Sequence, residues 1–388
     1  GEIVLYNLTP FKLRIKKIIV GDINLKTNII LEPSNFNSVS KKNFYLSKKI
    51  TIGKKLTLHT DLLRKKRTLE IKVENSNFRM SSLLKGEVKF PHFIKLKEKT
   101  YIINSGEWTI NEPIVLPEGY SLELKPNTKL TFKKNSYIYI NGGNLSSIGT
   151  LKKPIILKPE KKIWGGIFVS QSKNKKSQII YNKIIGTNFF KHGAINLTGG
   201  INFFLSNVEI ENTDIINSKA EDAINLIQSN FLIKNSNFIG HESDAIDSDF
   251  SKGVIENVFF NNVKNDALDT SGSKVSVINS NFINVSDKAI SAGENSVLTL
   301  ENLNIDNAKI GIASKDGSIV NGNKIGIANS LLYDIAAYQK KSFYKGGKIT
   351  IKNLEVNKMK TLIQKNSTAF INNEKIPTIK FKTKEKLY

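Results

Sequence analysis

The strongest constraint on the fold is a repeat of 22 residues in the middle of the chain. Small residues keep this interval four times in succession, at Ala223, Ala245, Ala267, Ala289 and Gly311. Three asparagines keep the same interval, at Asn235, Asn257 and Asn279. A unit of 22 residues is short for a helical repeat but suits three short strands with their corners. The repeat therefore predicts a right-handed, single-stranded parallel β-helix whose coils stack one on the next.

The rest of the sequence predicts an all-β chain in three parts. Residues 1–95 hold alternating apolar and polar stretches without a period, which is typical of a small β-sandwich-like domain. Residues 96–357 form the β-helix with coils of about 22 residues. Residues 358–388 are expected to cap its open end, because a bare solenoid edge invites aggregation.

The composition excludes several classes of function. The net charge is +24, but only four residues are arginine, and reading of bases or single strands favours arginine and stacked aromatics. We therefore expect no nucleic-acid partner. No apolar run approaches the roughly 20 residues of a membrane span, and without cysteine there is no disulfide framework. Because the chain starts at Gly1, we expect a mature form whose signal has been removed, located in the periplasm, at the cell surface or outside the cell.

The charge is unevenly distributed along the chain. From Glu209 to Asp316 there are 17 acidic and 8 basic residues, a net charge of −9, so the remainder carries +33. Within this acidic region, aspartates recur once per coil in the segments Ser243–Asp247 and Asn265–Asp269. Because the rest of the chain is basic, this local acidic cluster is the feature most indicative of a functional site.

Strand alternation predicts which side chains of these coils are exposed. If Ile224, Ile246, Leu268 and Ile290 face the core, Asn225, Asp247, Asp269 and Ser291 face outward, together with the small residue two positions earlier. Aspartates stacked about 4.8 Å apart repel one another. A bound divalent cation, shared protons or nearby lysines would have to compensate. The alternative is that the first aspartate of each coil, as in Asp244 and Asp266, only caps turn amides.

The motifs in these coils resemble those of the pectate-lyase-like β-helix superfamily. Ser243–Asp247, Asn265–Asp269 and Asp287–Gly293 fall where polygalacturonase-type glycosidases carry their catalytic motifs. The resemblance implies that Asp244 and Asp266 match two catalytic aspartates. Asn265 replaces the third, Lys288 takes the histidine position, and the later Arg-x-Lys pair is absent. Lyases and epimerases of the same scaffold use Ca²⁺ and a basic side chain, a role that only Lys288 could fill inside the ladder. The chain also resembles uncharacterised bacterial envelope β-helix proteins.

These patterns predict an exported protein that binds an anionic polysaccharide along an Asp-lined groove and processes it by hydrolysis, elimination or epimerisation. The expected catalytic residues are Asp244, Asp266, Asp269 and Lys288. The expected substrate-binding residues are Asn225, His241, Asp247, Asp249, Ser291 and Glu294. Asp247, Asp269 and Asp287 are the expected ligands of Ca²⁺. The alternatives are a non-catalytic envelope or adhesion protein that uses the aspartates to bind Ca²⁺ or glycan, and a trimeric fibre. The sequence leaves the oligomeric state open.

Overall fold

The computed structural model describes residues 2–7, 11–20, 23–33, 40–45, 55–62, 65–72, 93–172, 174–192 and 195–387. They belong to two compact units, Gly1–Lys85 and Gly86–Tyr388. No helix among these residues is long and apolar enough to cross a membrane.

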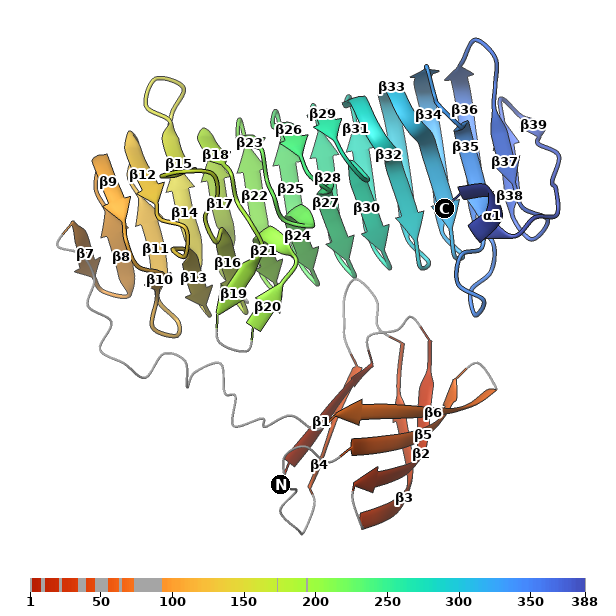
Figure 1. Ribbon diagram of the computed structural model, residues 1–388, viewed down its shortest axis with the longest axis horizontal. Helices are drawn as coiled ribbons and strands as arrows, with labels where there is room; N and C mark the ends of the chain where they lie inside the picture. The colour runs from red at the N-terminus through yellow and green to blue at the C-terminus, as the bar shows by residue number, and fades with distance from the viewer. Residues whose placement is uncertain are drawn as a thin grey trace. The chain divides into compact units, whose positions relative to one another are not determined.

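The N-terminal unit is a small antiparallel β-domain (Figure 1). Four strands pair in the order β3, β2, β5, β6, and two more, β1 and β4, pair with each other. Their bounds are β1 Glu2–Asn7, β2 Leu13–Val20, β3 Ile23–Leu31, β4 Ser40–Tyr45, β5 Lys55–Leu62 and β6 Lys65–Lys72. Ile15 and Ile18 of β2 are fully buried in its apolar core. The small β-domain expected before the solenoid is thus confirmed.

The second unit is a right-handed parallel β-helix of about 12 turns, which confirms the predicted fold (Figure 1). Each strand pairs in parallel with the equivalent strand of the next coil, so the solenoid has three faces. Face 1 comprises β10 (Ile114–Val115), β13 (Ile138–Asn141), β16 (Ile167–Ser170), β21 (Gly199–Phe204), β24 (Asp222–Ile227), β27 (Asp244–Asp249), β30 (Leu268–Ser271), the ends of β32 (Asn281–Gly293) and β33 (Val297–Lys315), β35 (Tyr333–Tyr338) and β37 (Thr361–Ile363).

The other two faces complete each coil. Face 2 comprises β8 (Thr100–Ile103), β11 (Ser121–Leu124), β14 (Leu145–Ile148), β17 (Ser177–Ile180), β22 (Val208–Glu211), β25 (Asn230–Lys234), β28 (Lys252–Glu256), β31 (Lys274–Ile278), the start of β33, β34 (Ile319–Ala328), β36 (Lys348–Glu355) and β38 (Thr368–Ile371). Face 3 comprises β9 (Gly106–Ile110), β12 (Thr128–Phe132), β15 (Ile155–Pro159), β18 (Asn182–Ile185), β23 (Asp214–Ile216), β26 (Asn237–His241), β29 (Phe259–Val263) and the remaining parts of β32, β33 and β34.

The register of the coils follows the sequence period. Ile224 pairs with Ile246, then with Leu268, Ile290 and Ile312 in turn, and all five side chains are buried. Phe238, Phe260 and Phe282 stack inside the solenoid, with ring centroids 5.1 and 4.7 Å apart. Equivalent side chains of successive coils therefore build the core, as the 22-residue repeat predicts.

Two columns of polar side chains form hydrogen bonds between successive coils at the corners of the solenoid. Asn235, Asn257 and Asn279 adopt φ values of 47°, 55° and 49°, a left-handed conformation that asparagine tolerates. The amide of Asn257 donates to Asn235 Oδ1 at 2.7 Å, which confirms their structural role. The sequence analysis missed a second column, in which Ser251 Oγ accepts from the Ser229 amide and Ser273 Oγ accepts from the Ser251 amide.

The alanines of the repeat are buried, which corrects the expectation that they face outward. Ala223, Ala245 and Ala267 have no exposed surface and belong to the apolar core cluster. The strict alternation breaks at this corner, because Asp222 pairs with Asp244 and Ile224 with Ile246, while Ala223 has no partner in the register. The alanines therefore leave no open strip beside the aspartates.

Two segments cover the outer side of face 1 near its ends. At the first coils, β19 (Phe190–His192) and β20 (Ile195–Leu197) form a hairpin whose Phe190 packs on Phe168 and Tyr139. At the last coils, Leu387 of α1 (Thr383–Leu387) and Phe381 pack against Ala313 and Ala336. β7 (Ile94–Lys97) and β39 (Glu374–Lys375) pair antiparallel with the terminal strands and end the sheet.

Candidate functional site on face 1

One outward-facing column of face 1 contains the predicted mid-strand aspartates. Successive pairing aligns Asn202, Asn225, Asp247, Asp269 and Ser291, one residue per coil. We call these five residues the site column. The register that strand alternation predicted for them is therefore present, and neighbouring members lie one coil apart, about 4.8 Å.

The site column reaches solvent at only two of its five positions. Asn202, Asn225 and Ser291 are buried, whereas Asp247 and Asp269 are partly exposed. The same column continues in both directions with buried apolar residues, towards Tyr139 and Phe168 on one side and towards Ala313, Ala336 and Leu362 on the other. The hairpin and the C-terminal segment thus cover the two ends of this column, and the accessible part of the column is limited to Asp247 and Asp269.

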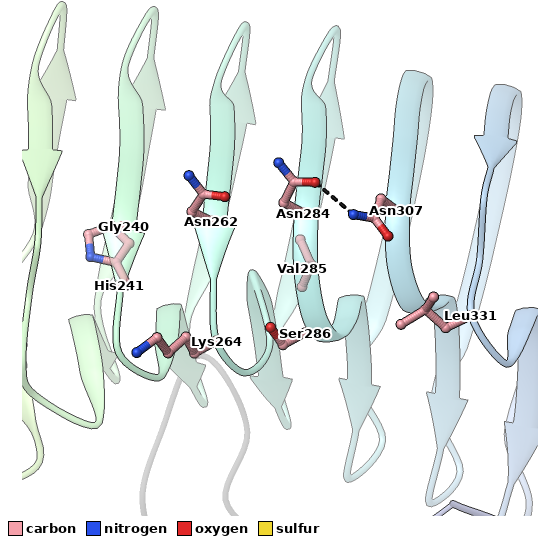
Figure 2. Close-up of a pocket in the computed structure, with 9 residues that line it drawn as sticks. All are labelled: Gly240, His241, Asn262, Lys264, Asn284, Val285, Ser286, Asn307 and Leu331. Carbon is pink, nitrogen blue, oxygen red and sulfur yellow. Dashed lines mark hydrogen bonds between the residues drawn. The ribbon is translucent and has the colours of Figure 1, made fainter.

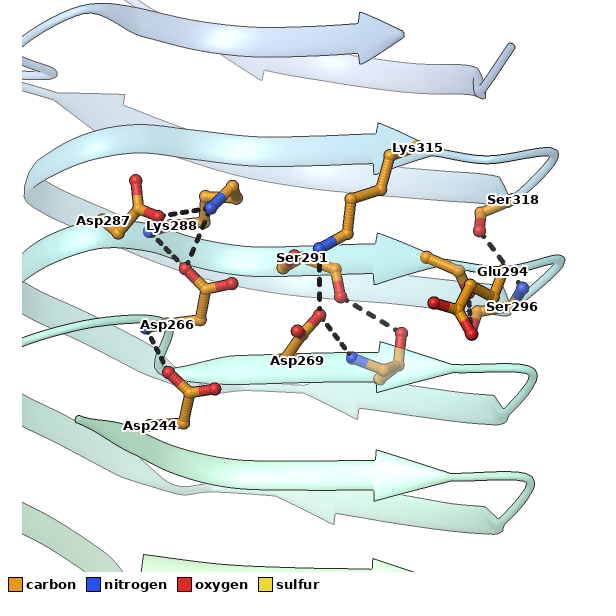
Figure 3. A network of polar contacts seen from close by, with 12 residues as sticks. Asp244, Asp266, Asp269, Asp287, Lys288, Ser291, Glu294, Ser296, Lys315 and Ser318 are labelled. Atoms are coloured by element: carbon orange, nitrogen blue, oxygen red, sulfur yellow. Dashed lines mark hydrogen bonds and ion pairs between the residues drawn. The ribbon is translucent and has the colours of Figure 1, made fainter. Parts of the chain in front are cut away.

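The first aspartates of the coils form a second, buried column. Asp244 Oδ1 accepts a hydrogen bond from the Asp266 amide at 2.8 Å, and Asp266 Oδ1 accepts one from the Lys288 amide at 2.9 Å. Figure 3 shows these links between successive coils. Both carboxylates therefore cap backbone groups, the role that the sequence analysis held as the alternative to catalysis.

Lys288, the only expected base among the lysines, lies buried between two carboxylates. Its Nζ is 3.2 Å from Asp266 Oδ1 and also contacts Asp287 Oδ2 (Figure 3). Burial lowers the pKa of Lys288, but the charges of Asp266 and Asp287 outweigh this effect and raise it. The side chain is therefore an ammonium ion at neutral pH and is unsuited to abstract a proton.

Replacement of Lys288 by Met should destabilise the fold rather than remove a base. Asp266 would be left buried without its cation, which costs about 3 kcal/mol when a buried ion pair loses one partner. The loss should shrink at pH 5, because burial raises the pKa of Asp266 and the carboxyl takes up a proton. Urea denaturation at pH 8 and pH 5 measures both effects. Lys264→Met, which removes an exposed partner of Glu242, should change stability by less than about 1 kcal/mol.

The carboxyls around Asp247 are shifted towards their protonated forms. Burial, followed by the charges of Asp249 and Asp222, raises the pKa of Asp247 well above its usual value. Burial and neighbouring aspartates also raise the pKa of Asp244 to about 8 and that of Asp249 to about 7. Retained protons on Asp244, Asp247 and Asp249 are therefore one compensation for the stacked aspartates, among the three that the sequence suggested.

Two lysines from later coils reach back towards the aspartates, and the sequence analysis missed both. Lys315 Nζ lies 3.4 Å from Asp269 Oδ1, although 46 residues separate them (Figure 3). Lys341 contacts the carboxylate of Glu294. The signal that could have found Lys315 is its position one 22-residue period after Gly293, next to the ladder.

Three polar atoms of the site column are buried without a hydrogen-bond partner. They are Asn202 Oδ1, Asn225 Oδ1 and Ser291 Oγ. The Asn225 amide nitrogen donates to Asp222 Oδ2 at 3.0 Å, which fixes the amide and leaves its oxygen free. Buried polar atoms are nearly always paired, so these oxygens require a partner outside the protein, such as an ordered water molecule or a ligand hydroxyl.

The residues expected to bind Ca²⁺ do not form one cluster. Among them, no three side chains of His, Asp or Glu are arranged to hold a metal ion. Asp287, expected beside Asp247 and Asp269 as a ligand, instead contacts Lys288 and Lys309. Calcium binding stays a prediction, and no step of the proposed mechanism depends on it.

His241 lies apart from the site column. It ends β26 on face 3, in register with Val263, and its Nδ1 accepts from the Ser218 amide at 3.3 Å. Burial lowers its pKa to about 3, so the ring is neutral. It borders a hollow of about 420 Å³ lined with Asn262, Asn284 and Asn307 (Figure 2).

Comparisons with known proteins find similarity only among solved structures. No family model and no curated protein matches the sequence. The catalytic domain of a GH87 alpha-1,3-glucanase has 13% identity and a TM-score of 0.44, over 95% of this chain and 90% of that one. The periplasmic alginate epimerase AlgG has 9% identity and a TM-score of 0.43, over 73% and 81%. The surface protein and adhesin PfbA of Streptococcus pneumoniae has 13% identity and a TM-score of 0.30, over 71% and 89%. No functional argument rests on these similarities.

Proposed function

We propose that this protein is an exported β-helix that binds a polysaccharide across the coils of face 1 and hydrolyses it with Asp247 and Asp269. The observation that carries the proposal is the site column. Its two accessible members are carboxyl groups in adjacent coils, and its buried members Asn225 and Ser291 present unpartnered oxygens on either side. A chain of sugar hydroxyls running across the coils would donate to these oxygens and pass over both carboxyls.

Hydrolysis of a glycoside requires one protonated and one ionised carboxyl. Asp247 fits the general acid, because burial and the neighbouring aspartates raise its pKa and keep a proton on it. Asp269 fits the base or nucleophile, since its carboxylate is ion-paired with Lys315. The environments of the two side chains thus assign them different roles.

The spacing of the coils favours a double displacement. Retaining glycosidases hold their carboxyls about 5–5.5 Å apart, and inverting ones about 6.5–9.5 Å. Residues paired across adjacent parallel strands lie about 4.8 Å apart, closer to the first class. We therefore expect retention of the anomeric configuration, with Asp269 as the nucleophile and Asp247 as the acid and then the base.

Elimination and epimerisation are less well supported by the geometry. Both require a base for the C5 proton, and Lys288, the residue expected to supply it, is buried and paired with Asp266 and Asp287. An anionic chain, the substrate expected from the sequence, would meet less repulsion as Asp249, whose pKa burial raises to about 7, becomes protonated. Activity on uronate chains should therefore rise as the pH falls from 8 to 6.

The test is a panel of uronate chains (polygalacturonate and alginate) and neutral chains (α- and β-glucans). Hydrolysis predicts new reducing ends without the far-ultraviolet absorbance of an unsaturated uronate, and proton NMR of the first product should show retention. Absorbance at the unsaturated end, or altered uronate signals without new ends, would contradict hydrolysis. Binding without any turnover on the whole panel would favour the non-catalytic envelope or adhesion protein.

A further inference from the structure

We infer that Lys315 is a positioning residue of this site: its ammonium group, which reaches past Gly293, fixes the charge of Asp269 and thereby decides which of the two accessible aspartates is the nucleophile. The inference rests on the proposed function for the role of Asp269 as nucleophile. The pairing of the lysine with Asp269 is a separate statement that can be tested without any substrate.

Lys315 contacts an aspartate that lies two coils earlier in the solenoid. It ends β33 and pairs with Tyr338, whereas Asp269 belongs to β30, two coils earlier. Its ammonium nitrogen lies 3.4 Å from Asp269 Oδ1 and the residue is only 7% exposed. Figure 3 shows the side chain extending from its own strand towards Asp269. Burying an ammonium group is costly unless it is paired, so the contact determines where the side chain lies.

The intervening coil contributes a glycine where the lysine passes. Gly293 pairs with Ser271 and lies within reach of the Lys315 side chain. A Cβ atom at Gly293 would lie 2.9 Å from Lys315 Cε and 3.3 Å from the Thr270 carbonyl oxygen. The backbone of Gly293 does not adopt a positive φ, so its conformation does not call for glycine. Glycine is required there because the methylene chain of Lys315 occupies the space that a side chain would need.

The two accessible aspartates consequently differ in their partners. Among the described residues, Asp269 has an ion pair with Lys315 and a hydrogen bond from the Thr270 amide at 2.9 Å, whereas no ion pair is present at Asp247. The other charged groups that act on this cluster are Asp222, Asp244, Asp249, Asp266, Asp287, Lys288 and Lys341. Lys315 is the one cation in ion-pair contact with a described member of the site column.

The experiment compares Lys315→Met, Lys315→Arg and Gly293→Ala with the wild type by ¹³C NMR of the aspartate carboxyls, assigned with Asp269→Asn. In Lys315→Met, Asp269 should take up its proton about one pH unit or more higher than in the wild type. Lys315→Arg should restore the wild-type titration, because it keeps the charge. Gly293→Ala should shift the titration of Asp269 in the same direction as Lys315→Met does. In the double variant, Gly293→Ala should cause no further shift beyond that of Lys315→Met.

The controls separate the pairing from the proposed chemistry. Lys264→Met, which removes an exposed lysine, should leave the Asp269 titration unchanged, and circular dichroism confirms that each variant is folded. An Asp269 titration that Lys315→Met or Gly293→Ala does not move overturns the inference, whatever the activity panel shows. If the protein hydrolyses a glycan, the acid limb of its pH–rate profile should move to higher pH together with the NMR titration, and a limb that stays in place overturns the assignment of the nucleophile.

Discussion

Asp269→Asn should reduce the rate of glycan hydrolysis about a thousandfold, the largest effect expected of any single substitution in this protein. The amide cannot act as nucleophile or base, and acid–base groups contribute roughly 10² to 10⁴ to the rate. The asparagine Oδ1 can still accept from the Thr270 amide. Because Lys315 loses its ion pair, circular dichroism checks that the variant is folded. The measurement is the release of reducing ends under single-turnover conditions at pH 6.

Asp247→Asn should lower the same rate by a similar factor, but with a different dependence on the substrate. An aryl leaving group needs no proton, so an aryl glycoside should recover much of the rate in Asp247→Asn and none in Asp269→Asn. Asp214→Asn, on face 3 and far from the site column in register, should retain wild-type activity. Equal losses in all three variants, or wild-type rates in Asp269→Asn, would contradict the assignment.

The second large effect concerns stability and pH. The free energy of unfolding should increase as the pH falls from 8.5 to 6.5. Burial and neighbouring charges raise the pKa of Asp244 to about 8, of Asp249 to about 7 and of Asp222 to about 6, whereas an unfolded aspartate titrates near 3.9. The folded state therefore binds more protons in this range, and stability falls as the pH rises through these values.

Below pH 6.5 one buried group opposes the aspartates without outweighing them. Burial lowers the pKa of His241 to about 3, while an unfolded histidine titrates near 6.5. The unfolded state then binds one proton at this histidine, which offsets only part of the gain from the three aspartates. The gain from the aspartates is therefore clearest between pH 6.5 and pH 8.5.

Asp244→Asn isolates the aspartate contribution. The asparagine keeps an oxygen for the Asp266 amide and removes the charge that burial disfavours. The variant should be more stable than the wild type by about 2 kcal/mol or more at pH 8.5, with the difference shrinking towards pH 5. Guanidinium denaturation at both pH values measures this. A wild type whose stability rises between pH 6.5 and pH 8.5, or an Asp244→Asn variant that is less stable at pH 8.5, would refute the buried, proton-sharing cluster.

Much of the fold follows from periodicity, because each coil of a solenoid contacts only its neighbours. The interval from Ile224 to Ile246 predicts both the register and the core, and alternation then places Asp247 beside Asp269 on the outside. The same alternation fails at Ala223, where the chain turns a corner and the side chain enters the core. Regular strands are therefore predictable from the pattern, and corners are not.

The candidate site was less predictable from the sequence, because the protonation state of each carboxyl depends on which residues bury it and which charges lie nearby. The motifs favoured Asp244 and Lys288 for catalysis, but the structure buries both and gives them backbone and ion-pair partners. The contact between Lys315 and Asp269 joins residues 46 positions apart and depends on the missing side chain of Gly293. No local motif contains that information.

The most direct test of the central claim is a crystal structure of Asp269→Asn with a hexasaccharide of the polysaccharide that the wild type cleaves. The account predicts a sugar chain crossing the coils of face 1, with hydroxyls donating to Asn225 Oδ1 and Ser291 Oγ and a glycosidic oxygen beside Asp247. A chain bound elsewhere, such as in the hollow lined with Asn262, Asn284 and Asn307, with the site column uncovered, would contradict it.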